Sequence, residues 1–90
     1  MRSFVGEQMT QRARGIAKLI HSSSQRAFCA LMKQARRKAG LTQQELADRL
    51  KKPQSFVAKV EGGERRIDVV EFLGIAQALG ADPIALLRAL

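Results

Sequence analysis

The sequence is poor in the side chains that build metal sites, disulfides and aromatic binding surfaces. Its 90 residues include one cysteine, one histidine, four phenylalanines and no tryptophan or tyrosine. One cysteine cannot form an internal disulfide, and one cysteine with one histidine cannot assemble a structural zinc site. The scarcity of aromatic rings argues against binding single-stranded nucleic acid by base stacking, which needs several exposed rings.

Long apolar runs are also missing. No stretch approaches the roughly 18–20 apolar residues of a membrane-spanning helix, and the N-terminus lacks the apolar core of a secretory signal. The first residues faintly resemble a transit peptide because they are acid-poor and rich in Arg and Ser, but they run directly into the first predicted helix. With the lone cysteine, which suits a reducing compartment, these features predict a cytoplasmic protein.

No residues form a convincing catalytic set. His21 is followed by Ser22, Ser23 and Ser24, but serines at the start of a helix cap its amides rather than form a triad. The sequence also has no Gly-rich phosphate-binding loop. We therefore predict that the protein is not an enzyme and has no metal or cofactor.

Positive charge is abundant but confined to one half of the chain. The formal net charge is +8; residues 1–40 contain nine Lys or Arg and one acid, whereas residues 41–90 contain seven of each sign. Such asymmetry favours a polyanionic partner, with nucleic acid first and an anionic membrane second. The basic run from Lys33 to Lys38 could instead be a solvated helix face.

Helical periodicity and clear helix ends dominate the rest of the sequence. Thr42 with Glu45 and Asp68 with Glu71 have the form of capping boxes, and no strand signal is present. These signals predict an all-α domain of five helices, over about residues 24–39, 43–50, 54–61, 69–79 and 83–89.

The predicted domain begins at residue 22 and extends to residue 90, with a helix-turn-helix over about residues 43–61. Residues 1–21 are the least informative, and two interpretations remain open for them. They form either a basic N-terminal arm or a short extra helix.

The predicted helix over residues 54–61 has the side chains that read base edges in the major groove of DNA. Its apolar residues fall on one side of a helical wheel, and small polar or basic residues fall on the other. A glutamine can bond adenine in a bidentate way, a serine can donate or accept, a lysine can reach guanine or a phosphate, and an alanine can touch a thymine methyl. The predicted base-contacting residues are Gln54, Ser55, Ala58 and Lys59. They could also be ordinary exposed residues.

Groups suited to phosphate surround this helix. The amides of Thr42, Gln43 and Gln44, at the start of the helix over residues 43–50, are predicted to be unpaired donors at the positive end of a helix dipole. Two guanidinium groups follow the reading helix. The predicted phosphate contacts are Thr42, Gln43, Gln44, Lys51, Lys52, Arg65 and Arg66. Alternatively, Gln43 and Gln44 are plain helix formers. Arg65 and Arg66 could likewise be plain surface residues, or Arg66 could pair with Asp68.

Residues 31–79 resemble the helix-turn-helix domains of phage repressors and Cro proteins, the xenobiotic-response-element (XRE) type. Three segments carry the resemblance, and they fall together at the family's spacing: Leu41–Ala47, Pro53–Val57 and Glu61–Phe72. The resemblance implies a compact, lambda-repressor-like domain of five helices. It also implies a dimer that binds a palindromic operator on double-stranded DNA in a bacterial or phage nucleoid.

Individual positions follow the family pattern, with two departures. Gln43 matches the family's phosphate-contacting glutamine, and Gln54, Ser55 and Lys59 match its base readers. Arg36 and Glu61 match a structural ion pair between the first and third helices in some members. Lys51 stands where the family often has glycine, and Pro53 replaces the frequent Ser or Thr cap.

These observations lead us to expect a sequence-specific transcriptional regulator, a dimeric repressor that inserts residues 54–61 into the major groove and has no membrane partner. The dimer surface could be the apolar tail, with Ile84, Leu86, Leu87 and Leu90, or the segment 1–21. Alternatively, Ile84, Leu87 and Leu90 are ordinary core. The alternative is an antitoxin-like module that binds a protein such as a toxin, with DNA binding secondary. An RNA target fits less well, because the reading helix suits a B-form groove.

Overall fold

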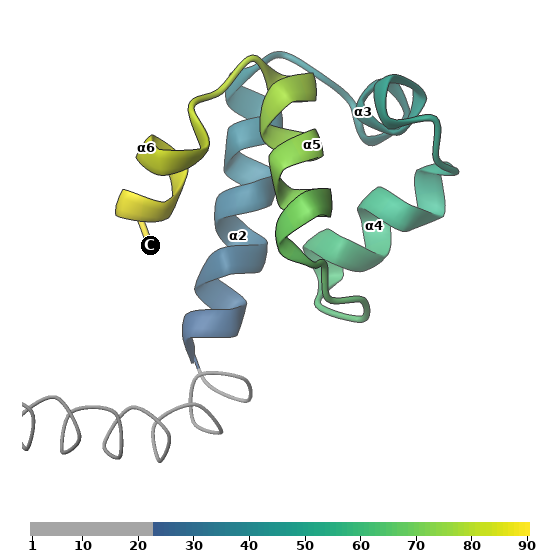
Figure 1. Cartoon of the computed structure of the whole chain (residues 1–90). Coiled ribbons are helices and arrows are strands. Elements are labelled where there is room, and N and C mark those ends of the chain that lie inside the picture. The colour runs from purple at the N-terminus through teal and green to yellow at the C-terminus, as the bar shows by residue number, and fades with distance from the viewer. Residues whose placement is uncertain (1–22) are drawn as a thin grey trace, which may run out of the picture.

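The computed structural model describes residues 23–90, which form five helices (Figure 1). They are α2 (Ser23–Lys38), α3 (Gln43–Leu50), α4 (Gln54–Gly62), α5 (Val69–Leu79) and α6 (Pro83–Arg88). Every helix end lies within one residue of its predicted position, and no strand occurs in residues 23–90. The all-α prediction is therefore confirmed, whereas the predicted arm or helix at residues 1–21 lies outside the described residues.

None of the described helices is both long and apolar enough to cross a membrane. The longest, α2, has 16 residues, and basic side chains crowd its last turn.

Capping boxes fix the starts of α3 and α5. Thr42 Oγ1 accepts a hydrogen bond from the Glu45 amide at 3.0 Å, and the Glu45 carboxylate accepts one from the Thr42 amide at 2.8 Å. Asp68 and Glu71 exchange the same two hydrogen bonds, at 2.7 and 2.9 Å. Each box pairs two amides that a helix start would otherwise leave without partners. The hydrogen bonds to Thr42 also lower the pKa of Glu45.

The turn between α3 and α4 is made by a lysine in a left-handed conformation. Lys51 has φ 55° and ψ 43°, and its amide donates to carbonyls of the last turn of α3. Among the described residues it is the one non-glycine with positive φ. Pro53 then adopts an extended conformation as the N-cap of α4, without a side-chain cap. This short connection joins the end of α3 to the start of α4, and the angle between the two helices lets the Gln54 side chain reach Gln43 at the start of α3.

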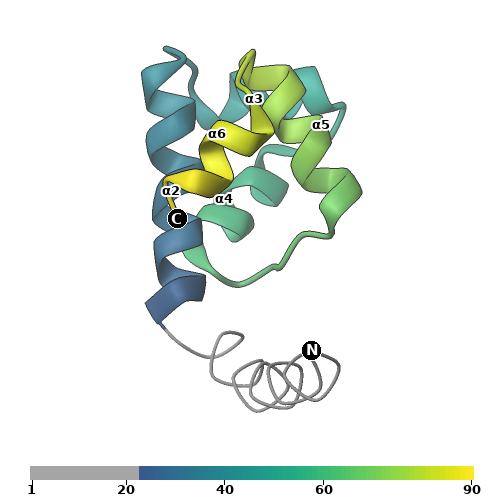
Figure 2. The ribbon, with the colours of Figure 1, turned by 60° about the vertical axis from the view of Figure 1, so that its left-hand side comes forward.

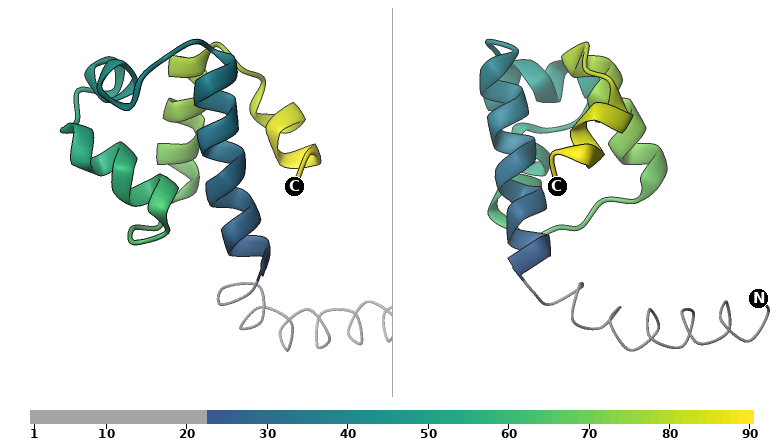
Figure 3. Two further views of the ribbon diagram at one scale, coloured as in Figure 1. Left: turned by 180° about the vertical axis from the view of Figure 1, so that it is seen from behind. Right: turned by 90° about the vertical axis from the view of Figure 1, so that its left-hand side faces the viewer.

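The core lies among α2, α3, α4 and α5. It is built from apolar residues of these helices and the loop before α3: Met32, Leu41, Leu46, Ala47, Phe56, Val57, Val60, Phe72, Ile75 and Leu79. The rings of Phe28 and Phe72 lie 5.8 Å apart and join α2 to α5. Cys29 is buried and free. Helices α3 and α4 lie on one side of α2 and α5, and α6 lies on the other (Figures 1 and 3).

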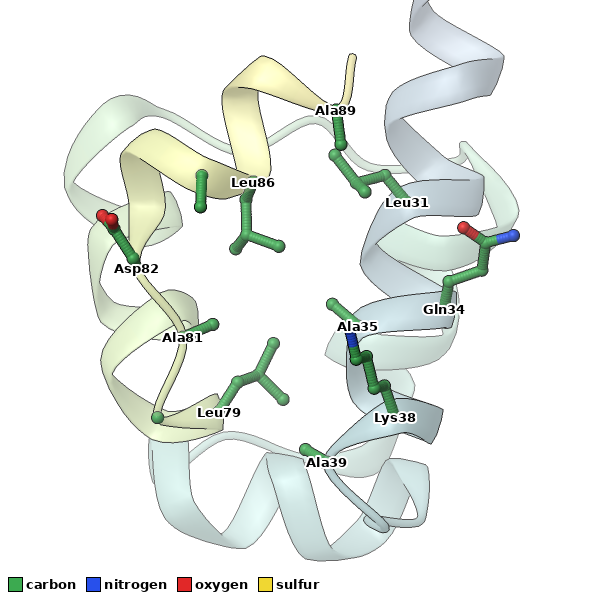
Figure 4. Close-up of a pocket in the computed structure, with 12 residues that line it drawn as sticks. Leu31, Gln34, Ala35, Lys38, Ala39, Leu79, Ala81, Asp82, Leu86 and Ala89 are labelled. Atoms are coloured by element: carbon green, nitrogen blue, oxygen red, sulfur yellow. The ribbon is translucent and has the colours of Figure 1, made fainter.

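Helix α6 packs more loosely than the others. None of its residues is buried, and Figure 2 shows it crossing in front of α2 and α5. A cavity of about 520 Å³ separates it from α2, with Leu31 and Ala35 on one wall and Leu86 and Ala89 on the other (Figure 4). Leu86 packs against the core, whereas Ile84, Leu87 and Leu90 are 56%, 47% and 55% exposed. The interpretation of Ile84, Leu87 and Leu90 as ordinary core is therefore wrong, because all three side chains are exposed.

Candidate nucleic-acid interface

Helix α4 has one buried side and one exposed side. Phe56, Val57 and Val60 are buried in the core. The residues predicted to read bases lie on the opposite side, where Gln54, Ser55 and Lys59 are exposed and Ala58 is half-buried. The apolar side anchors the helix, and its amide, hydroxyl and ammonium groups remain available to a partner.

A buried ion pair holds α4 against α2. Arg36 Nε donates to Glu61 Oε2 at 2.7 Å, and its Nη2 donates to Glu61 Oε1 at 3.0 Å. The third guanidinium nitrogen, Nη1, donates to the Leu41 carbonyl at 2.8 Å. The Arg36 and Glu61 side chains are only 8% and 5% exposed. A bidentate pair in such surroundings satisfies both charges and fixes the angle between the two helices.

The Glu61 carboxyl is ionised in these surroundings. Its burial opposes ionisation, but hydrogen bonds from Arg36 and Gln43, with the charges of Arg36 and Lys33, outweigh that cost. The pKa of Glu61 consequently lies below its ordinary value.

Two glutamines connect this ion pair to the exposed side of α4. Gln43 Nε2 donates to Glu61 Oε1 at 3.1 Å, and Gln54 Nε2 donates to Gln43 Oε1 at 2.6 Å. Gln43 is the first residue of α3 and Gln54 the first residue of α4. Sequence reasoning selected each glutamine separately and missed the contact between them. No local signal in the sequence gives this contact, because it depends on the angle between α3 and α4.

The start of α3 differs in one respect from the sequence prediction. The Thr42 amide was expected to be an unpaired donor, but it bonds to Glu45 in the capping box. The prediction for that amide is therefore wrong, because the capping box uses it. The amides of Gln43 and Gln44 remain at the positive end of the helix dipole. The Gln44 side chain donates to Asp48 Oδ1 at 2.8 Å.

The two arginines after α4 have different surroundings. Arg65 is half-buried, its guanidinium lies 4.7 Å from the centroid of the Phe56 ring, and it binds both carboxylate oxygens of Glu71 at 3.2 and 2.9 Å. These hydrogen bonds, with that from the Asp68 amide, lower the pKa of Glu71. Arg66 is exposed. Arg65 thus ties the loop to α4 and α5, and Arg66 lies at an exposed position beside it.

The other exposed cations predicted to contact phosphate come from the turn before α4. Lys51 and Lys52 are exposed, and the Lys52 ammonium lies 5.5 Å from the centroid of the Phe56 ring. Positive charge therefore flanks α4 at both ends. Among residues 23–90, no three His, Cys, Asp or Glu side chains come together in a way that could hold a metal ion.

Comparisons with known proteins agree with this architecture. A model of a helix-turn-helix family matches residues 32–86. An XRE-family like protein from Pseudomonas syringae pv. tomato str. DC3000 has a similar solved structure, with 48% sequence identity and a TM-score of 0.74, covering 83% of this chain and 92% of that one. The restriction-modification controller protein C.AhdI from Aeromonas hydrophila has 31% identity and a TM-score of 0.66, covering 71% of this chain and 97% of its own. No curated protein sequence matches the chain.

Proposed function

Because this chain belongs to the XRE-type helix-turn-helix family of DNA-binding transcriptional regulators, we propose that it is a sequence-specific, dimeric repressor that inserts α4 into the major groove. The exposed side of α4 carries this proposal. It presents an amide, a hydroxyl, a small methyl and an ammonium group on a helix whose opposite side is locked into the core. These are the groups that distinguish base pairs in the major groove.

Each exposed residue has a role in this proposal. Gln54, Ser55, Ala58 and Lys59 contact base edges. The amides of Gln43 and Gln44, together with Lys51, Lys52 and Arg66, contact phosphates and set the position of α4 in the groove. Thr42 and Arg65 act through structure, since the groups expected to meet phosphate already bind Glu45 and Glu71.

Repression would follow from occupancy of the operator. Helix α4 has nine residues, which is about two and a half turns, so one copy covers only a half-site. Two copies whose reading helices are about 34 Å apart would meet successive major grooves of a palindrome. The pair then gains affinity that one copy lacks and blocks access of polymerase or a competing factor.

The test is selection of bound fragments from a random pool of double-stranded DNA, repeated with altered α4. The natural chain should select a palindrome. Gln54→Ala and Ser55→Ala should each cost about 1–3 kcal/mol per lost base contact and relax preference at one position in each half-site. Gln77→Ala, an exposed glutamine on α5, is the matched control and should leave the selected sequence unchanged. If both α4 variants still select the same DNA sequence as the natural chain, α4 does not read bases.

One observation favours a second function, a protein-binding module of the antitoxin kind with DNA binding secondary. Ile84, Leu87 and Leu90 expose large apolar side chains at the C-terminal end, and such side chains are costly to leave in water when no partner covers them. Sedimentation separates the two functions. A chain that stays monomeric and selects no DNA sequence would support the protein-binding role, whereas a DNA-selecting dimer supports the repressor.

A further inference from the structure

We propose that the cavity between α2 and α6 binds an aliphatic carboxylate, with its hydrocarbon chain between the two helices and its carboxylate paired with the Lys38 ammonium group. This inference goes beyond the proposed function, because it gives the domain a small-molecule site on the side of α2 and α5 that lies away from α4 (Figure 1).

The walls of the cavity are mainly hydrocarbon. Their apolar residues come from α2, from the end of α5 and from α6: Leu31, Ala35, Leu79, Leu86 and Ala89. Figure 4 shows the three leucines pointing toward one another across the cavity. A chain of methylene groups placed there releases water from two apolar surfaces at once, which is the main driving force for binding apolar ligands.

The cavity is large enough for a ligand and is open to it. Its volume of about 520 Å³ lies within the range of roughly 300–1,000 Å³ for small-molecule sites. Leu31, Ala35 and Leu86 are only half-buried, so a ligand can reach these walls from solvent. Water in such a space finds few hydrogen-bond partners, which favours its replacement by hydrocarbon.

One cation stands at the edge of the cavity. Lys38 is among the lining residues, and Figure 4 shows its side chain running along α2 toward Ala35. Within residues 23–90 its ammonium group has no hydrogen bond or ion pair. A single ammonium group is a compact charge that suits a head group with one negative charge. A carboxylate can therefore pair with Lys38 while its chain stays on the apolar walls.

The two other polar side chains at the cavity do not favour a cation. Asp82 Oδ1 accepts a hydrogen bond from the Ile84 amide at 3.0 Å and so caps α6. Its carboxylate points away from the cavity, as does the Gln34 amide (Figure 4). The charge that faces a ligand is therefore positive, and it selects an anionic head group over a cationic one.

The exposed apolar set at the C-terminal end is separate from this cavity. Ile84, Leu87 and Leu90 expose their side chains, and none of them lines the cavity. A dimer formed through these three residues does not need to fill the cavity, which stays available to a ligand in each copy.

The first test is an NMR titration of the full chain with decanoate below its micelle concentration. We expect saturable shifts of the Leu31, Leu79 and Leu86 methyl signals and nuclear Overhauser contacts from these methyls to the decanoate chain. Decylamine has the same chain and the opposite charge, so it should bind on the order of tenfold more weakly, because attraction to Lys38 becomes repulsion. Failure of decanoate to bind, or equal binding of the two compounds, would contradict the inference.

The head-group pairing is tested by Lys38→Gln. This change should weaken decanoate binding about fivefold, the upper end for an ion pair at an exposed site. The matched control, Arg37→Gln, removes the same charge from an exposed neighbour that does not line the cavity, and it should leave the affinity unchanged. Equal losses in the two variants would show that decanoate responds to the general charge of α2 and not to Lys38, and the pairing would be wrong.

The location is tested by filling the cavity. Ala35→Leu and Ala89→Leu enlarge side chains on opposite walls (Figure 4), and each should abolish decanoate binding. Ala30→Leu adds the same side chain at an exposed position of α2 outside the cavity and should change nothing. Circular dichroism identifies a variant that fails to fold; Ala89, the exposed C-cap of α6, is the more tolerant position. Full binding by a folded Ala89→Leu chain would place decanoate elsewhere and refute the site.

Two further outcomes would assign the cavity to another occupant and so overturn the inference. Sedimentation of a natural dimer that becomes a monomer in Ala89→Leu would show that a second copy fills the cavity. Binding to phosphatidylglycerol vesicles without binding to decanoate would show a membrane contact. None of these measurements uses DNA. A chain that binds decanoate but selects no DNA sequence would therefore overturn the proposed function alone, and the reverse result would overturn this inference alone.

Discussion

Lys51 shows how one residue can set an inter-helix turn at a cost to stability. Its φ of 55° lies in the left-handed region, where a side chain costs roughly 1–2 kcal/mol relative to glycine. Lys51→Gly should therefore stabilise the fold by about 0.5–1 kcal/mol, after allowing for the greater freedom of glycine in the unfolded chain. Urea denaturation measures this change. If Lys51 contacts phosphate, the same variant should also bind all DNA sequences less tightly.

The neighbouring lysine provides the control for this prediction. Lys52 does not have positive φ, and its ammonium lies near the Phe56 ring. Lys52→Gly should therefore lower stability. If the two glycine substitutions change the free energy of unfolding equally, the left-handed backbone of Lys51 is not the source of the effect.

The buried pair makes acid stability depend on Glu61. Glu61→Gln leaves the Arg36 charge without its anionic partner and should cost about 3 kcal/mol at pH 7. Since the pKa of Glu61 in the folded chain lies below its ordinary value of 4.5, its contribution is fully present above pH 4.5 and is lost as the pH falls through the lowered pKa. The difference in unfolding free energy between the natural chain and Glu61→Gln should therefore shrink over that range.

Urea denaturation as a function of pH measures this difference. Glu64→Gln is the control because it removes an exposed carboxylate from the adjacent loop, and it should change stability by less than about 0.5 kcal/mol. A difference that stays constant from pH 7 to pH 3 would show that Glu61 does not act through its charge.

Among the helices, the features that the sequence predicted correctly are those that local chemistry determines. Capping boxes and apolar spacing place all five helices, because each signal lies within a few residues of the end it controls. The Gln43–Gln54 hydrogen bond and the contact of Arg65 with Phe56 are different. They depend on the angle between helices or on the path of a loop, and several side chains within reach could have made the same contacts.

The loop after α4 should contribute to the salt dependence of DNA binding. Arg66 is exposed, and each phosphate contact adds about 0.9 to the slope of log affinity against log salt. Arg66→Ala should therefore reduce that slope by about 0.9 and weaken binding to all sequences alike. Fluorescence anisotropy with labelled duplexes at several salt concentrations measures it. The control is Arg88→Ala, which removes an exposed arginine on α6 and should leave the slope unchanged. If the slope is also unchanged in Arg66→Ala, the loop after α4 does not contact phosphate.

For the whole molecule, the question is which apolar surface joins two copies. Two exposed sets are available in residues 23–90: Val69, Val70 and Leu73 at the start of α5, and Ile84, Leu87 and Leu90 at the C-terminal end. Helix α6 lies across α2 and α5 from α4 (Figure 1). A dimer formed through α6 therefore leaves both copies of α4 uncovered, and we expect the C-terminal set to form the interface.

Leu87→Glu and Val70→Glu distinguish the two surfaces. Leu87 is 47% and Val70 77% exposed, so either carboxylate can reach water in the monomer and the fold should tolerate both changes. In the core of an interface, however, an unpaired charge loses its hydration, and this cost opposes association. Sedimentation at micromolar concentration should show that Leu87→Glu is a monomer and Val70→Glu remains a dimer. Affinity for a full palindrome should fall in Leu87→Glu toward that for one half-site, because two linked contacts become independent. If Val70→Glu is instead a monomer and Leu87→Glu remains a dimer, the interface lies at the start of α5.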